Sequence, residues 1–237
     1  MKRILPFIII LVVLGAALGS AWYFTRPNPA TPTVTQPAPP PSPGSQSTPA
    51  QQPVARQGVP GAEPAHSIGP ANAPIHLEEF GDFECPPCGM LHPILEQMHE
   101  EFGERLRITF REFPLANHQH ARTAAAAAEA AGIQGKFWPM HDLIYERQNV
   151  WKTQFNTRAI FEDYAREIGL DVERYNRDMD GNLVTQRIFQ DSRRGQSLGV
   201  QGTPTVFMNG REVPFENLAP DKLRLVIMKE LQAVGSK

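Results

Sequence analysis

The only two cysteines of this 237-residue chain, Cys85 and Cys88, stand three positions apart in the stretch FECPPCGM. Such a pair can form a structural disulfide, bind a metal, lie inert in a core, or exchange disulfides. A disulfide across so short a loop adds little stability, and structural zinc needs four ligands where the chain offers two thiols. Two prolines between the cysteines also fit a buried core segment poorly. The spacing therefore favours a redox pair.

The chemistry of a redox pair depends on where each sulfur lies. At the start of a helix, unpaired backbone N–H groups and the helix dipole stabilise a thiolate. Cys85 is then the accessible nucleophile, and Cys88, one turn into the helix, resolves the mixed disulfide. Pro86 and Pro87 carry no N–H, and Asp82 and Glu84, expected to be solvated, add negative charge. We therefore expect a Cys85 pKa below that of a free thiol, but less depressed than with His between the cysteines.

An acid near the pair is a candidate proton carrier. Glu79 lies six residues before Cys85 and shares strand parity with Ile75 and Leu77, so that it is expected to face inward. Burial raises the pKa of a carboxyl, and such a group can exchange a proton with Cys88 during resolution. The alternative, a carboxylate at the sheet edge that reaches solvent, is equally compatible with the sequence.

The elements that position these residues follow an α/β order. Period-two and period-3.6 patterns predict two strands around one helix, a helical block, a hairpin at Asn209-Gly210, and a last helix. The first strand, helix and strand should form a right-handed parallel crossover. The ranges expected are strands at Ile75–Phe80, Leu106–Phe113, Thr205–Met208 and Arg211–Val213, and helices at Pro87–Phe102, Arg122–Ala131, Phe137–Gln148, Arg158–Ile168, Asp171–Met179, Asn182–Leu198 and Pro220–Val234.

The N-terminal part differs from the rest of the chain. Lys2 and Arg3 precede the uncharged run Ile4–Phe24, so residues 1–26 are expected to be a membrane anchor with a cytoplasmic N-terminus, or alternatively a cleaved signal peptide. Residues 27–66 are expected to be a disordered linker, since 12 prolines fall between positions 27 and 64. One folded domain is expected over 67–237, and both alternatives for residues 1–26 export it.

The domain resembles the DsbA-like branch of the thioredoxin superfamily. The resemblance rests on CPPC after a strand, on Gly202-Thr203-Pro204-Thr205, on the helical block between them, and on the stretch GKFWPMHD at 135–142. It implies a thioredoxin-like fold with a helical insertion at about 116–199. It also implies a cis peptide bond before Pro204, beside Cys85, where an extended substrate pairs with the backbone of Thr203 and contacts Pro86 and Pro87.

These observations lead to one expected function, an exported, membrane-tethered thiol:disulfide oxidoreductase that forms disulfides in exported proteins. The resemblance implies reoxidation of the reduced pair by a quinone-linked membrane protein, or otherwise a reductant donor. The alternatives are a reductase or isomerase of the same fold, and a tethered metal-binding or copper-delivery module using Cys85, Cys88 and His92.

Other expectations concern the setting of the domain. A bacterial cell envelope is expected, with the domain in the periplasm or extracytoplasmic space, soluble or secreted if the N-terminus is cleaved. We expect no cofactor, no metal in the redox site, a monomer, and no nucleic-acid partner for a chain of net charge −2. Lys136, Trp138 and His141 are assigned to packing and surface of the insertion.

Overall fold

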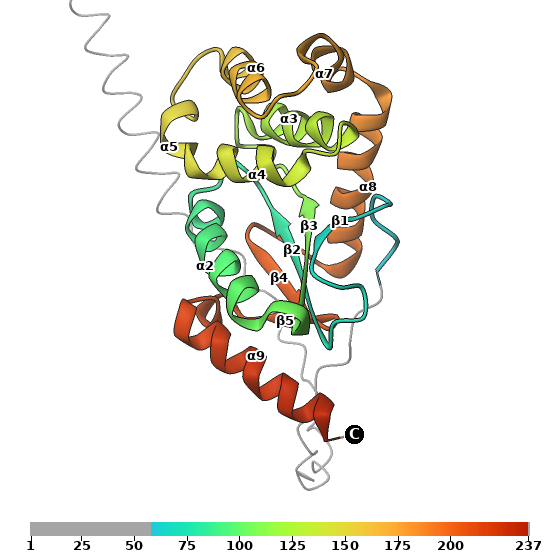
Figure 1. Cartoon of the computed structure of the whole chain (residues 1–237), viewed down its shortest axis with the longest axis vertical. Coiled ribbons are helices and arrows are strands. Elements are labelled where there is room, and N and C mark those ends of the chain that lie inside the picture. The colour runs from blue at the N-terminus through green and yellow to red at the C-terminus, as the bar shows by residue number, and fades with distance from the viewer. Residues whose placement is uncertain (1–57, 237) are drawn as a thin grey trace, which may run out of the picture. The chain divides into compact units, whose positions relative to one another are not determined.

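The computed structural model describes residues 58–236, which form a five-stranded mixed sheet with helices on both faces and a helical cap at one end (Figure 1). The strand order is β1-β3-β2-β4-β5. The strands are β1 His66–Ile68, β2 Ile75–Gly81, β3 Leu106–Glu112, β4 Thr205–Met208 and β5 Arg211–Val213. The helices are α2 Pro86–Phe102, α3 Ala121–Ile133, α4 Phe137–Glu146, α5 Gln148–Trp151, α6 Thr157–Glu167, α7 Val172–Met179, α8 Asn182–Leu198 and α9 Pro220–Gly235, with short 3-10 turns η1 Gly103–Arg105 and η2 Phe215–Asn217.

The central strands follow the predicted order. Strand β2 pairs in parallel with β3, as a crossover through α2 requires, and pairs antiparallel with β4. Strands β4 and β5 form the predicted hairpin, in which both Asn209 and Gly210 have positive φ angles, of 49° and 77°. Two successive positive φ angles are the signature of the type I′ turn that matches the twist of a hairpin. The sheet is therefore built as the sequence patterns indicated.

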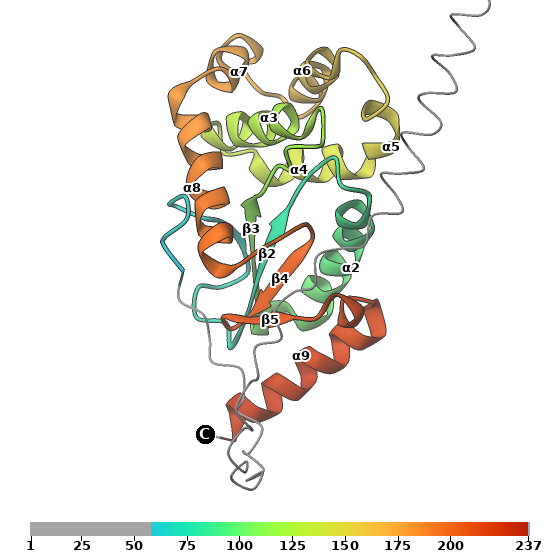
Figure 2. The same cartoon turned by 180° about the vertical axis from the view of Figure 1, so that it is seen from behind.

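Alternation along β2 divides the core between the two faces of the sheet. Leu77 packs with Leu91 and Leu95 of α2 and with Leu223 of α9, on one face. Phe80 packs instead with Leu198 at the end of α8, which lies over the other face (Figure 2). Residues of β2 that share the parity of Leu77, Glu79 among them, thus face the active-site helix.

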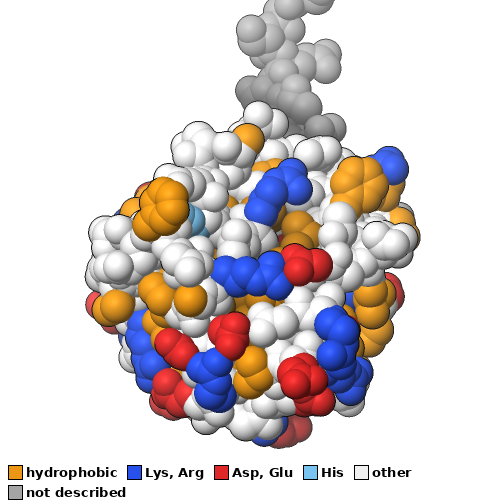
Figure 3. All heavy atoms as spheres, turned by 90° about the horizontal axis from the view of Figure 1, so that it is seen from above, with side chains coloured by type: hydrophobic (Ala, Val, Ile, Leu, Met, Phe, Trp, Pro, Cys, Tyr) orange, Lys and Arg blue, Asp and Glu red, His pale blue; other side chains and the backbone are white. Residues whose placement is uncertain are grey.

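The helical insertion, α3 to α8, covers the end of the sheet where β2 stops and the cysteine pair begins (Figure 1). Small alanines of α3 let α4, α6, α7 and α8 pack closely around it, and most of them are fully buried. On the outer side of this end, Lys and Arg side chains are interspersed with Asp and Glu (Figure 3). The predicted helix at 137–148 breaks at Arg147, so that Gln148 begins a separate short helix, α5.

The boundary expected for the linker is wrong at its C-terminal end. Residues 58–66 pack against the domain, and Ala62 is completely buried. The backbone of Ala62 is held on both sides, because its N–H donates to Asp191 of α8 and its carbonyl accepts from Arg111 of β3. His66 then starts β1, which pairs antiparallel with β3. Composition indicated no core in this segment, but its polar backbone groups find partners on distant elements.

The rest of the linker, 27–57, and the expected anchor, 1–26, lie outside the described residues. Across residues 58–236, none of the helices combines the length and the apolar character needed to cross a bilayer.

Candidate active site

The cysteine pair lies at the junction of β2 and α2. Cys85 is the residue that caps α2, with extended backbone angles of φ −70° and ψ 119°, and prolines fill the first two helical positions. Proline is suited to those positions because their N–H groups have no partner inside a helix. The N–H of Cys88 donates to the carbonyl of Cys85 at 3.1 Å, which fixes the turn. The predicted placement of the first sulfur at a helix start is confirmed.

The two thiols titrate in opposite directions. A hydrogen bond from the Cys88 thiol, helped by Thr203 and by the N–H of Cys88, lowers the pKa of Cys85 to about 6, against the opposing effects of burial and Asp82. Burial raises the pKa of Cys88 well above its usual value, and the hydrogen bond to Cys85 and the charge of Glu79 act in the same direction. At pH 7 Cys85 is therefore mainly a thiolate and Cys88 a thiol, the assignment expected of a nucleophile and its resolving partner.

The expectation that Cys85 stands open to solvent is wrong. Cys85 is only 4% exposed, and Cys88 is fully buried. In its protonated form the Cys85 thiol donates to the carbonyl of Thr203 at 3.2 Å, so that the segment before β4 lies against the sulfur. A substrate must reach Cys85 through the small exposed area that remains, or through a local movement of that segment.

The residues predicted to contact substrate lie at two different places in the structure. The Thr203–Pro204 bond is cis, as the resemblance implied. Pro204 and Pro87 line one apolar groove of about 280 Å³, whose other walls come from α2 and from the segment between β5 and α9. Pro86 is exposed and faces a different depression, between α2 and α4. The side chains that complete the groove, which the sequence did not single out, are Met90, Leu91, Ile94, Phe215, Glu216, Leu218 and Ala219.

Glu79 lies on the inward face of β2, as its parity predicted. It is 3% exposed, and its Oε1 has no hydrogen-bond partner. Burial, with a smaller contribution from the Cys85 thiolate, raises the pKa of Glu79 to about 8. Of the two alternatives for this residue, the solvated edge carboxylate is wrong. A carboxyl that titrates near neutral pH and interacts with both sulfurs is suited to proton exchange.

Asp82 and Gln148 hold the turn that carries Cys85. Asp82 was expected to be solvated but is 1% exposed, because its carboxylate accepts from the N–H groups of Glu84 and Leu115 and pairs with His118. Gln148 donates to the carbonyls of Phe83 and Cys85, at 2.7 and 2.9 Å. Nothing in the sequence indicated this role of Gln148, because the break before α5 that directs its amide depends on tertiary packing.

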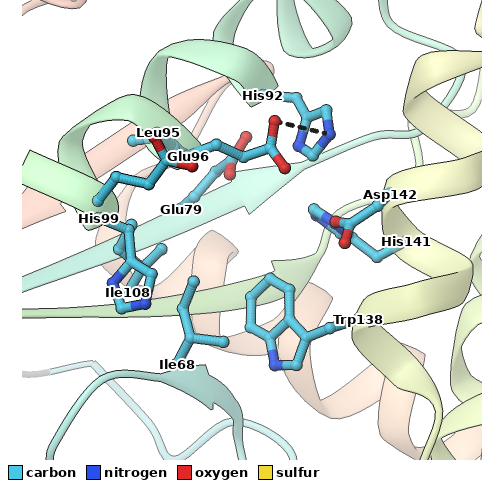
Figure 4. A pocket seen from close by; sticks show the side chains of 11 residues that line it. Ile68, Glu79, His92, Leu95, Glu96, His99, Ile108, Trp138, His141 and Asp142 are labelled. Atoms are coloured by element: carbon cyan, nitrogen blue, oxygen red, sulfur yellow. Dashed lines mark hydrogen bonds and ion pairs between the residues drawn. The ribbon is translucent and has the colours of Figure 1, made fainter. Parts of the chain in front are cut away.

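A cavity of about 230 Å³ lies behind Glu79, between α2, β1, β3 and α4 (Figure 4). His92 of α2 and His141 of α4 line it together with Trp138 and Asp142. The two imidazoles are 6% and 4% exposed, and burial lowers the pKa of both, that of His92 to about 4. His141 also packs edge-on against Phe83 and Phe110, which fits its predicted role in packing.

The alternative metal site with His92 and the two thiols is not assembled. Within residues 58–236, the potential ligand atoms that gather around His92 come from His141 and Asp142, and neither cysteine joins them.

Comparisons with known proteins identify the family of the chain. A family model described as Thioredoxin matches residues 62–229. The chain belongs to the thioredoxin family. Solved structures of DsbA proteins share its fold.

Solved structures share the fold of this thioredoxin-family chain. Oxidised BdbD of Bacillus subtilis superposes with a TM-score of 0.63 at 24% identity, covering 71% of this chain and 93% of BdbD. Alpha-DsbA1 of Wolbachia pipientis gives 0.62 at 17% identity, covering 74% and 95%. A thioredoxin-like oxidoreductase of Silicibacter pomeroyi gives 0.55 at 27% identity, covering 68% and 91%.

Similar curated sequences carry other names. The chain is 39% identical over 147 residues to a Na(+)/H(+) antiporter NhaA 1 of Salinispora arenicola, and 37% identical over 148 residues to an antiporter NhaA of Herminiimonas arsenicoxydans. The match covers 62% of this chain but only 22% and 23% of those proteins. The chain thus corresponds to about a fifth of each antiporter, and the likeness concerns that segment alone.

Proposed function

We propose that this thioredoxin-family domain forms disulfide bonds in exported proteins. The observation that carries the proposal is the opposite titration of the two sulfurs, with the Cys85 pKa lowered to about 6 and that of Cys88 raised well above its usual value. Two groups whose pKa values are shifted in opposite directions can take different roles in one reaction, here nucleophile and proton-bearing partner. A stabilised thiolate also stabilises the reduced pair, which makes the disulfide a better oxidant.

The reaction proceeds by two exchanges. A substrate thiolate attacks the sulfur of Cys85 in the oxidised Cys85–Cys88 bond, and Cys88 leaves with the electron pair. Protonated Glu79 supplies a proton to Cys88, whose high pKa favours the thiol. A second substrate thiolate then attacks the substrate sulfur of the mixed disulfide, and Cys85 leaves as a thiolate. The substrate gains a disulfide, and Cys85 and Cys88 are left reduced, having accepted two electrons.

The apolar groove beside Pro204 suits an extended, incompletely folded substrate. Met90 and Phe215 on its rim are 64% and 62% exposed, an unusual surface for side chains of this size. We propose that substrate pairs with the backbone next to Thr203 as an added strand and places apolar side chains in the groove. Substrates of this kind are exported chains that still carry free thiols.

The location of the domain is also part of the proposal. The uncharged run at 4–24 after Lys2 and Arg3 supports a membrane anchor with the domain on the far side of a bacterial inner membrane. There, a quinone-linked membrane protein would reoxidise the pair. Carbonate extraction of membranes tests the tether: the full chain should stay with the membrane, whereas a chain without residues 1–26 should not.

One measurement decides between the oxidant and a reductase or isomerase of the same fold. The Cys85 pKa favours the reduced pair by about 1.4 kcal/mol at pH 7, or roughly 30 mV, in the oxidising direction. The equilibrium potential against glutathione measures the sum of all such effects: a value near about −120 mV would assign an oxidant, and one near about −270 mV a reductant. The Cys88→Ser variant keeps a Cys85 thiolate that can open a disulfide in another protein but lacks the partner that would resolve the product, so it should trap mixed disulfides with disulfide-containing proteins, whereas Cys85→Ser should trap none.

A further inference from the structure

The cavity between α2 and α4 collects metal-binding groups that the disulfide chemistry does not use. One ligand nitrogen each of His92 and His141 and one carboxylate oxygen of Asp142 lie within 4.8 Å of one another. The two rings stand edge to face with centroids 5.2 Å apart, and Figure 4 shows that they come from two different helices bordering the cavity. Glu96, one helical turn after His92, brings a further carboxylate oxygen to 3.7 Å from His92 Nε2.

Both imidazoles carry an atom without a partner. His92 Nε2 and His141 Nε2 are buried and make no hydrogen bond, although burying a polar atom unpaired costs free energy. The Nδ1 of His141 is already engaged, 2.9 Å from the carboxylate of Asp142.

We propose that this cavity binds one divalent transition-metal ion of the zinc type through His92, His141 and Asp142, with Glu96 as the fourth ligand. Imidazole nitrogens with carboxylate oxygens are a ligand set that zinc accepts in tetrahedral geometry. Calcium and magnesium are disfavoured, because both require a larger set of oxygen ligands. The bound ion links the active-site helix α2 to α4 of the insertion and satisfies the unpaired nitrogens.

The experiment is a Zn²⁺ titration by calorimetry on the untagged full chain carrying Cys85→Ser and Cys88→Ser, so that no thiolate can bind the ion. A single saturable site with one Zn²⁺ per chain is expected. His92→Ala and His141→Ala should each weaken binding by at least about 10-fold, the lower range seen when only an outer-shell partner is lost. The matched control is His99→Ala, since His99 also lines the cavity but lies outside the ligand cluster.

A second variant keeps the test decisive if the alanine variants fold poorly. Asp142→Asn removes a charged ligand at nearly constant volume, from a side chain that is 37% exposed. It should weaken Zn²⁺ binding and reduce the visible absorption of Co²⁺ bound in a tetrahedral site. Absence of saturable binding, an equal loss in His99→Ala, or unchanged affinity in Asp142→Asn would each overturn the proposal. None of these outcomes depends on the redox activity of the pair.

Discussion

Replacing Glu79 by Gln should make the reduced protein more stable at neutral pH. The carboxyl titrates near pH 4.5 in an unfolded chain and near pH 8 in the folded one. Both states are protonated below pH 4.5, so the carboxyl costs nothing there. Between pH 4.5 and 8 only the unfolded state releases the proton, and folding stability falls by about 1.4 kcal/mol per pH unit. At pH 7 the deficit reaches about 3 kcal/mol, which Glu79→Gln removes.

The assay is urea unfolding of both proteins at pH 4.5 and pH 7. The difference in unfolding free energy between Glu79→Gln and the wild type should grow by about 3 kcal/mol over this interval, which cancels any constant effect of the amide. The gain should be smaller in the oxidised protein, because the Cys85 thiolate contributes to the raised pKa. Glu104→Gln, at an exposed position, is the control. Parallel pH profiles for Glu79→Gln and wild type would refute the reasoning.

Glu79→Gln should slow disulfide exchange, although it stabilises the fold. Without a proton carrier beside Cys88, opening of the Cys85–Cys88 disulfide by a thiol should slow by about 100-fold or more, the usual range for a lost general acid or base. The reactivity of the reduced Cys85 thiolate should change far less. Stopped-flow reduction of the oxidised pair by a small dithiol measures the first rate, and alkylation of reduced Cys85 measures the second. An unchanged rate of reduction would remove Glu79 from the mechanism.

Further predictions concern the turn and the groove. Alkylation of reduced Cys85 should reach half its maximal rate at about pH 6, and a midpoint near 9 would contradict the stabilised thiolate. Asp82→Asn should lower that midpoint further, since the Asp82 charge raises the Cys85 pKa; thiolate absorbance against pH reads the shift. Gln148→Ala leaves the Phe83 carbonyl without this donor, while the Cys85 carbonyl keeps the N–H groups of Cys88 and Gly89, and should cost about 1–3 kcal/mol in urea unfolding. Phe215→Ser should raise KM for an unfolded thiol substrate with the potential unchanged, whereas Leu225→Ser, an exposed site outside the groove, should not; equal effects would exclude the groove.

Local patterns predicted most of the elements correctly. Alternation identified β2 and β3, the Asn209-Gly210 signal identified the hairpin, and helical periodicity identified α2, because these features depend on neighbours in the sequence. The inward direction of Glu79 followed from parity alone. The cysteine pair at the helix start was likewise predictable, since the prolines that follow Cys85 fit only the first turn of a helix.

Features that depend on contacts between distant residues could not be predicted from the sequence. Strand β1 has three residues and exists only because β3 offers a free edge. The burial of Cys85 comes from the Thr203 segment, 118 residues away. The meeting of His92 with His141 requires α4 to fold back along α2. The burial of His92 could have been predicted, because it follows Leu91 on the apolar side of α2 and is one turn from Cys88.

Residues 58–66 set the minimum size of a transplantable domain. A fragment starting at Ser67 would leave the guanidinium of Arg111 without the Ala62 carbonyl, and that of Arg187 without the carbonyls of Glu63 and Pro64. It would also remove the first residue of an edge strand. When such a domain is moved into another protein, a junction placed before Gly58 keeps these hydrogen bonds. A junction at residue 66 removes the carbonyl groups that accept from Arg111 and Arg187.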